Sequence, residues 1–372
     1  MKRKLYIGIG ITLVLAVAIV VVVQRKKKET TIGIVLPLSG SMAQYGDNGR
    51  NGLTLASEEM SRDNGCGNLK LIYQDSGEAP PETTSAVRRL IDANGVRYII
   101  GGLTSGGVLN ALPTVKERGV LFFTPAASAP GIPDGNLVFR NWPSDDALAS
   151  TFGRVAHEKL GLKNVAILHV SNDYGKTNAD AFSASFTKAG GNVVLVRAFP
   201  QGTTDFKSLI TIVSSLKDLD KVLLIAYPDE YKALFQEISI HKLGNRGVLA
   251  SDTFYSPELL SQLGSAAEGT VIAVAAKPGD DYEPRQQFIK AYRDRFKKDP
   301  GLVSDTAYDA LHIICRGIKD TDGEPRSVGQ WLRNLKDYQG AAGLVNFNST
   351  GDVTGDLALY EVVKGKFEPR RF

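Results

Sequence analysis

The sequence predicts an α/β protein built from two doubly wound parallel-sheet lobes, preceded by one N-terminal transmembrane helix. From Thr30 onward, short apolar runs alternate with amphipathic stretches of helical period, which is the pattern of βα units. The alternation occurs twice in series, and a length of 372 residues fits two domains better than one. An uncharged apolar stretch precedes this body.

The N-terminal stretch has the length of a membrane span. Leu5 to Val23 are 19 residues without a charge, and a helix of that length extends about 29 Å, close to the thickness of a bilayer's hydrocarbon core. A cleaved secretory signal has a shorter apolar run and a small-residue cleavage site. We therefore predict a retained anchor within residues 1–29, with a cleaved signal or a buried core helix as alternatives. Basic residues flank both ends, so charge does not fix the orientation.

The first series opens with a strand at Thr31–Leu38, which is rich in β-branched residues. Leu53, Ala56 and Met60 then give one apolar face to the helix that follows. The remaining expectations are strands at Leu69–Gln74, Val96–Gly101 and Val120–Phe123, and helices at Gly49–Arg62, Thr83–Asn94 and Val108–Glu117.

A second series of similar size follows, and then three helices and a β segment close the chain. A three-helix tail cannot form a third sheet domain, so we expect it to return to the first lobe. The expected strands are Val165–Val170, Val193–Phe199, Lys221–Ala226 and Gly247–Ala250, and the helices are Ala147–Leu160, Asn178–Ala189, Asp205–Lys217, Glu230–Lys242, Pro284–Lys298, Ser304–Ile318 and Ser327–Leu335, before the β segment Gly343–Lys366.

This order implies that the chain passes between the lobes three times, so that a three-segment hinge joins them. The expected lobes are residues 30–141 with 279–346, and residues 142–278 with 347–372. The expected crossovers are near Arg140–Pro143, Lys277–Gly279 and Asn346–Ser349.

Charge and cysteine content narrow the possible functions. Beyond residue 28 the chain has 37 basic and 40 acidic residues, which argues against nucleic-acid binding. Cys66 lies in a glycine-flanked loop and Cys315 in an expected helix. We predict one exposed and one buried thiol, although export would permit a disulfide.

Ligands of open parallel sheets bind beyond the carboxyl ends of the strands, so the loops there are the candidate site. In the glycine-rich turn at Gly101–Gly107, Ser105 stands where a helix N-terminus favours a carboxylate, although a simple helix cap would explain it equally well. Asp252 follows a strand among aromatic residues, which favours pairing with a cation over a turn-forming role. The other candidate loops are Ser39–Asp47, Thr124–Pro130, Asn172–Tyr174 and Tyr227–Asp229.

Catalysis is not expected. The four histidines are scattered, and the sequence has no Gly-x-Ser-x-Gly elbow, phosphate-loop lysine or His-x-x-Glu-His pair. We therefore predict no catalytic residue, metal or cofactor. A hydrolase using Ser105 would need a histidine base, and only His169 lies near an expected strand end.

The body resembles the branched-chain amino-acid (Leu/Ile/Val) type of periplasmic substrate-binding protein of ATP-binding-cassette importers, with the type I periplasmic binding fold. The similarity covers about Thr30 to Glu361. It depends on GIVLPLSGSMAQYG at Gly33–Gly46, the Gly101–Ser105 turn, TPAASAP at Thr124–Pro130, NDYG at Asn172–Gly175 and VNFNSTGD at Val345–Asp352.

The resemblance implies a role for seven residues. In the first lobe, Ser105 and the backbone of Ala126 would hold the ligand's carboxylate, Ser128 would share its polar end, and Tyr45 would line the side-chain pocket. In the second lobe, Tyr174 and Tyr227 would line the site and Asp252 would pair with the ammonium. This chain departs from the family in having aspartate where glutamate is usual, in lacking the family's first-lobe cysteines, and in its anchor.

We therefore predict an extracytoplasmic solute-binding protein, tethered to the cell membrane or released after cleavage. It would bind an amino acid or a similar polar solute and deliver it to ABC permease subunits. A sensor or amide-responsive regulator of the same fold is the main alternative. Delivery is favoured because the sequence through Phe372 contains no kinase or DNA-binding module.

Overall fold

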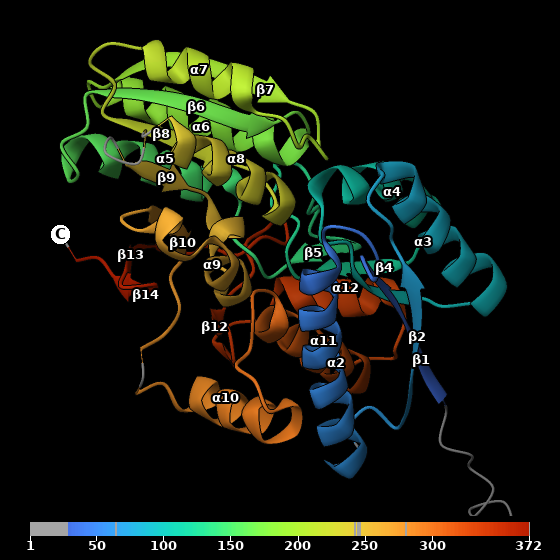
Figure 1. Ribbon diagram of the computed structural model, residues 1–372. Helices are drawn as coiled ribbons and strands as arrows, with labels where there is room; N and C mark the ends of the chain where they lie inside the picture. The colour runs from blue at the N-terminus through green and yellow to red at the C-terminus, as the bar shows by residue number, and fades with distance from the viewer. Residues whose placement is uncertain (1–28, 64, 242, 244–246, 280, 372) are drawn as a thin grey trace, which may run out of the picture.

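The computed structural model describes residues 29–63, 65–241, 243, 247–279 and 281–371, which form two parallel sheets with helices packed on them (Figure 1). The predicted membrane segment Leu5–Val23 lies outside the described residues. Within these ranges, no helix is both long and apolar enough to span a membrane. The α/β class predicted from the alternating pattern is confirmed.

The first sheet has the strand order β2-β1-β3-β4-β5, and all its neighbours are parallel. Successive residues of a strand face opposite sides. Val35 therefore packs in the core beneath α3 and α4, whereas Ile34 packs on the α2 side. The elements are β1 (Glu29–Leu36), α2 (Ala43–Asp63), β2 (Asn68–Asp75), α3 (Pro80–Asn94), β3 (Tyr98–Gly101), α4 (Ser105–Glu117), β4 (Leu121–Thr124) and β5 (Val138–Arg140).

The second sheet has the order β14-β13-β10-β9-β8-β6-β7. Strands β6 to β10 are parallel, and β13 and β14 extend the sheet as an antiparallel edge. The elements are α5 (Asp145–Glu158), β6 (Asn164–Val170), α6 (Asp173–Lys188), β7 (Asn192–Phe199), α7 (Lys207–Ser215), β8 (Lys221–Ile225), α8 (Pro228–Ile240), β9 (Val248–Ala250), the 3-10 turn η2 (Asp252–Phe254), α9 (Pro257–Leu263), the 3-10 turn η3 (Gly264–Ala267), β10 (Val271–Ala275), β13 (Leu357–Val363) and β14 (Lys366–Pro369).

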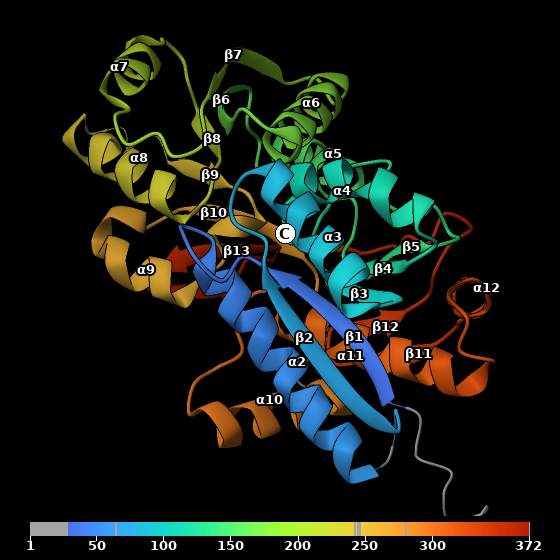
Figure 2. The same cartoon turned by 90° about the vertical axis from the view of Figure 1, so that its right-hand side faces the viewer.

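The C-terminal helices return to the first sheet, as predicted. Helix α11 packs along α2 and contacts β3, and α12 contacts β4. Figure 2 shows α10 and α11 beside α2 on one side of β1 and β2. The elements are α10 (Glu283–Phe296), α11 (Ser304–Asp320), α12 (Pro325–Arg333), β11 (Tyr338–Gly340) and β12 (Gly343–Val345).

The third crossover lies later than predicted. The Phe347 ring packs edge-on against Phe123 and Phe139 of the first sheet, with centroid distances of 5.9 and 5.5 Å. Asp352 pairs with Arg140 of β5. The chain therefore leaves the first lobe after Asp352 and not at Asn346–Ser349, because Phe347 fills the apolar core there.

Several element boundaries also differ from the predictions. Helix α2 begins at Ala43 and not at Gly49, because tertiary packing overrides the low helix propensity of Gly46 and Gly49. Strands β5, β10 and β11 and helix α9 were not predicted. Strand β5 spans only three residues, and the short apolar run of β10 has no periodicity that distinguishes strand from helix.

The prediction of two free thiols is wrong, because Cys66 and Cys315 form a disulfide. Cys66 precedes β2 and Cys315 lies in α11, with Cα atoms 5.2 Å apart across 249 residues of sequence. The bond ties α11 to the amino-terminal end of the first sheet. It fits an oxidising compartment outside the cytoplasm.

Replacing both cysteines by serine should lower the free energy of unfolding by about 2 to 4 kcal/mol, because the bond closes a long loop in the unfolded chain. Urea unfolding of the variant and of the wild type, with and without reductant, measures this. Ligand affinity should not change, since the bond lies at the opposite ends of the strands from the site described below. An unaltered urea midpoint would contradict the assignment of a stabilising bond.

Candidate ligand-binding site

The carboxyl ends of strands from both sheets lie next to the same pocket. In each, the strand order places the first strand between the second and the third, as in β2-β1-β3 and β7-β6-β8. Loops diverge at such a switch point and leave a crevice beyond the carboxyl ends of the strands. The loops after β1 and β3 of one lobe and after β6, β8 and β9 of the other border a single pocket.

All seven predicted site residues line this pocket, which has a cavity volume of about 40 Å³. Its walls combine hydroxyl, aliphatic and aromatic side chains with one carboxylate. Among the described residues, no basic side chain lines it. The lining residues are Met42, Tyr45, Leu103, Ser105, Ala126, Ser128, Trp142, Tyr174, Tyr227, Asp252, Thr253, Leu302 and Val303.

The first lobe presents hydrogen-bond donors. Ser105 is the first residue of α4, and its Oγ accepts hydrogen bonds from the backbone N–H groups of Ser128 (3.3 Å) and Ala129 (3.1 Å). A hydroxyl has two lone pairs and one proton, so the Ser105 proton is left to donate to another group. Thr104, the N-cap, makes no side-chain capping bond. The start of α4 therefore keeps free N–H groups that favour an anion.

The turn before α4 requires glycine. Gly101 has φ 138° and Gly102 has φ 69°, and a Cβ on Gly101 would lie 1.9 Å from the carbonyl oxygen of Val35. This close approach lets the chain turn at the end of β3, so that Ser105 reaches the pocket.

Buried hydrogen bonds hold the loop after β4. Thr124 Oγ1 accepts from the N–H of Ala127 at 3.0 Å and of Ala126 at 3.4 Å. The latter is long for an N–H···O bond, so the Ala126 N–H is available to a ligand. Arg140 is fully buried and donates to the carbonyl oxygens of Ala127 (3.1 Å) and Ala129 (3.0 Å).

The second lobe presents the carboxylate of Asp252. Its Oδ1 accepts hydrogen bonds from the Tyr174 hydroxyl at 2.7 Å and from the Thr253 N–H at 2.9 Å. Burial raises the pKa of Asp252, and hydrogen bonds from Tyr174 and Trp142 oppose that increase. A cation is therefore the partner that this carboxylate lacks.

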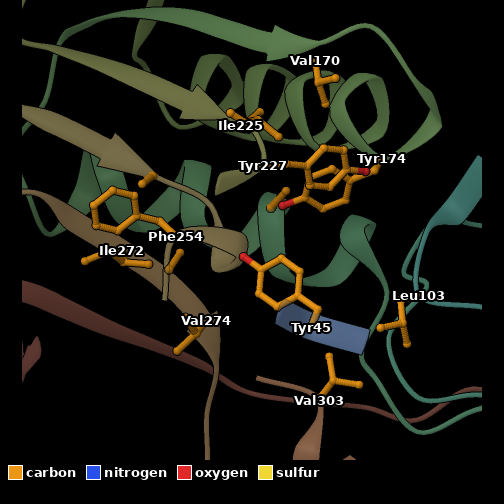
Figure 3. Close-up of a cluster of buried hydrophobic side chains, with 14 of the residues drawn as sticks. Tyr45, Leu103, Val170, Tyr174, Ile225, Tyr227, Phe254, Ile272, Val274 and Val303 are labelled. Atoms are coloured by element: carbon orange, nitrogen blue, oxygen red, sulfur yellow. The ribbon is translucent and has the colours of Figure 1, made fainter. Parts of the chain in front are cut away.

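Three tyrosines form the aromatic wall. The rings of Tyr174 and Tyr227 stack at a centroid distance of 5.6 Å, and Figure 3 shows Tyr45 facing them from α2. Burial raises the pKa of all three phenols above the usual value, so each stays neutral. The Tyr45 hydroxyl donates to the carbonyl oxygen of Thr253 and so connects the two lobes directly.

Six further lining residues are not among the seven predicted site residues. Leu302 and Val303 come from the loop before α11, far along the chain, and no strand-end pattern marks them. Val303 has φ 76°, a left-handed conformation that a β-branched side chain rarely adopts, which places backbone strain at the site. The other four lie in or beside loops that contain predicted site residues. They are Met42, Leu103, Trp142 and Thr253.

The hydrolase alternative fails on geometry. Ser105 Oγ contacts backbone N–H groups, which are not bases. His169 lies on β6, where its Nδ1 is 2.9 Å from the carbonyl oxygen of Val170, and it does not line the pocket. Donors on one lobe and a carboxylate on the other, with no nucleophile–base pair among the lining residues, define a two-lobed solute-binding protein.

Comparison with known proteins supports the assignment as a solute-binding protein. The family model described as periplasmic binding protein matches residues 29–366. Leu/Ile/Val-binding protein BraC3 of Rhizobium johnstonii is 30% identical over 350 residues, which cover 91% of this chain and 93% of that protein. The chain belongs to the periplasmic binding protein family, in its branched-chain amino-acid type, and it is a binding protein rather than an enzyme.

Solved structures share the fold. The branched-chain amino acid transporter substrate-binding protein LivJ of Streptococcus pneumoniae, in complex with isoleucine, has a TM-score of 0.84 at 23% identity and covers 92% of this chain and 98% of its own. A solute-binding protein of R. palustris in complex with benzoate has a TM-score of 0.84 at 21% identity, with coverage of 92% and 95%. This is the type I periplasmic binding fold.

Proposed function

We propose that this protein captures an aliphatic amino acid between its lobes and delivers it to the membrane subunits of an ABC importer. The observation that carries the proposal is the polarity of the pocket. Ser105, Ala126 and Ser128 of one lobe and the carboxyl group of Asp252 of the other line the same pocket, together with apolar side chains. A zwitterion with a carboxylate and an ammonium matches both ends.

The walls favour an aliphatic side chain. Met42, Leu103 and Val303 are buried and apolar, and the relatives compared above include Leu/Ile/Val-binding proteins. The benzoate complex of the R. palustris protein raises aromatic acids as the alternative. Asp252 disfavours such a ligand, because benzoate has no cationic group to pair with this buried carboxyl group.

A thermal-shift screen tests the proposal. Residues 29–372 would be heated with each of the twenty amino acids, benzoate, 4-hydroxybenzoate, small amides and urea. A ligand that binds only the folded form raises the melting temperature. We expect leucine, isoleucine or valine to give the largest shift. A shift with benzoate and none with any amino acid would contradict the proposal.

The Ser105→Ala variant should bind its amino acid about 1 to 3 kcal/mol more weakly, because a hydrogen bond to a charged carboxylate is lost. Isothermal titration calorimetry measures the change. Ser85→Ala, on the exposed side of α3, is the matched control and should bind as the wild type does. Unchanged affinity in Ser105→Ala would place the carboxylate elsewhere.

We further propose that Leu5–Val23 holds the protein at the outer face of the cell membrane. The support is the uncharged 19-residue stretch. Membrane fractionation with N-terminal sequencing of the mature protein tests this. An intact N-terminus in the membrane fraction is expected, and a mature chain that starts after Val23 in the soluble fraction would show a cleaved signal instead.

A further inference from the structure

Asp145 is a buried carboxylic acid next to the binding pocket to which the sequence assigned no role. It is the first residue of α5, just after the first crossover, and only 3% of it is exposed. Its backbone N–H donates to the carbonyl oxygen of Ser128 at 3.0 Å, so it adjoins the predicted carboxylate end. Its Oδ2 has no hydrogen-bond partner among the described residues. A buried oxygen without a partner is costly and requires an explanation.

Asp145 lines a second, smaller cavity that shares one lining residue with the pocket. Both Asp145 and Asp252 line this cavity, and Asp252 also lines the main pocket. Its volume of about 20 Å³ is close to that of one small molecule such as water. Asn178 and Ser251 add polar atoms, and the remaining lining is apolar. The two acids therefore border the same small space.

The groups around Asp145 and Asp252 favour a proton on this pair of carboxylates. Burial disfavours the charged form of Asp145, and Asp252 on η2 repels it further. The opposing groups are the Ser128 and Asn178 side chains and Arg140. The guanidinium of Arg140 is already bound to Asp352 and to two loop carbonyls. The other titratable groups nearby are Tyr174 and Tyr227, which are neutral. The result is a pKa of Asp145 raised to about 7.

We propose that Asp145 is a second acidic group of the ligand-binding site, and that it forms with Asp252 a pair that exchanges a proton for the ligand's ammonium. This inference rests on the proposed function, because it requires a ligand with a cationic nitrogen. The ammonium binds Asp252, ends its repulsion of Asp145, and favours the ionised form of both carboxylates. Ligand capture therefore releases a proton.

The sign of the pH dependence follows from this exchange. Without ligand, Asp145 holds a proton below about pH 7, and binding must remove it. Affinity for the amino acid should therefore rise with pH between 5 and 7, by at most about tenfold per pH unit for one proton. The affinity should level off about one pH unit above 7, since half of the molecules still hold the proton at a pH equal to the pKa.

Calorimetric titration with L-isoleucine at pH 5.5, 6.5 and 7.5, in buffers of different ionisation enthalpy, tests the inference on the unmodified protein. The expected result is proton release that is nearly complete at pH 5.5, smaller at pH 6.5 and smallest at pH 7.5. Asp145→Asn should largely lose both the release and the pH slope. Asp146→Asn, its exposed neighbour, is the matched control and should keep both.

Each outcome is decisive. Binding without proton release in the wild type overturns the inference and leaves the proposed function standing. The same holds if Asp145→Asn, shown to be folded by its thermal melt, retains the wild-type slope. If no amino acid binds at any pH, the proposed function fails and this inference fails with it.

Discussion

Asp252→Asn should weaken amino-acid binding by about 2 to 5 kcal/mol, because the ligand's ammonium would be buried without its counter-charge. Asparagine keeps an oxygen that can accept the hydrogen bonds from Tyr174 and from the Thr253 N–H. The variant should therefore fold normally, and its loss of affinity should result from the missing charge rather than from a change in structure. Isothermal titration calorimetry of the folded variant measures it.

A matched control variant and a result that would contradict the prediction complete this test. Asp229→Asn changes an exposed carboxylate at the start of α8, in the same lobe, which pairs with Lys232 on the surface. It should leave affinity unchanged. If Asp252→Asn instead bound benzoate more tightly and amino acids no more weakly, the ligand would be an anion without an ammonium.

Arg140→Met should lower the free energy of unfolding by about 3 to 5 kcal/mol, because it removes one partner of a buried ion pair. Arg140 is fully buried and bonds both carboxylate oxygens of Asp352, at 2.9 and 2.5 Å. Its loss also leaves the carbonyl oxygens of Ala127 and Ala129 without these donors. Because that loop carries Ala126 and Ser128, ligand affinity should fall as well.

Urea unfolding measures the change in stability. Arg118→Met is the control, since Arg118 forms an exposed ion pair with Asp92, and such pairs contribute about 1 kcal/mol or less. The double variant Arg140→Met with Asp352→Leu should recover part of the lost stability, because no unpaired charge remains. A cost for Arg140→Met equal to that for Arg118→Met would contradict the account.

Much of the site could be predicted because its residues follow strands. The rule that ligands bind beyond strand ends directed attention to Ser105 and Asp252, and the resemblance added Tyr45, Tyr174 and Tyr227. All of them line one pocket. Asp145 was missed because an acid at the start of a helix is explained equally well as a cap. Its burial and its position beside Asp252 depend on how α5 packs against α6 and the second sheet, which sequence patterns do not describe.

Long-range features were the hardest to predict. Nothing local to Cys66 or Cys315 indicates that α11 packs against α2 and brings the two sulfurs together. The third crossover was misplaced for a similar reason, since the position of Phe347 depends on its packing against Phe123 and Phe139, which are distant in sequence. Periodicity identified most strands and helices, whereas α2 was shortened by its glycines.

The most direct test of the central claim removes each charged end of the ligand in turn. Calorimetric titrations would compare L-leucine with isocaproate, which lacks the ammonium, and with isoamylamine, which lacks the carboxylate. Clamping of a zwitterion between Ser105 and Asp252 predicts tight binding of leucine and at least about a hundredfold weaker binding of both analogues, since each leaves one buried polar end unpaired. Binding of isocaproate as tight as that of leucine would contradict the account.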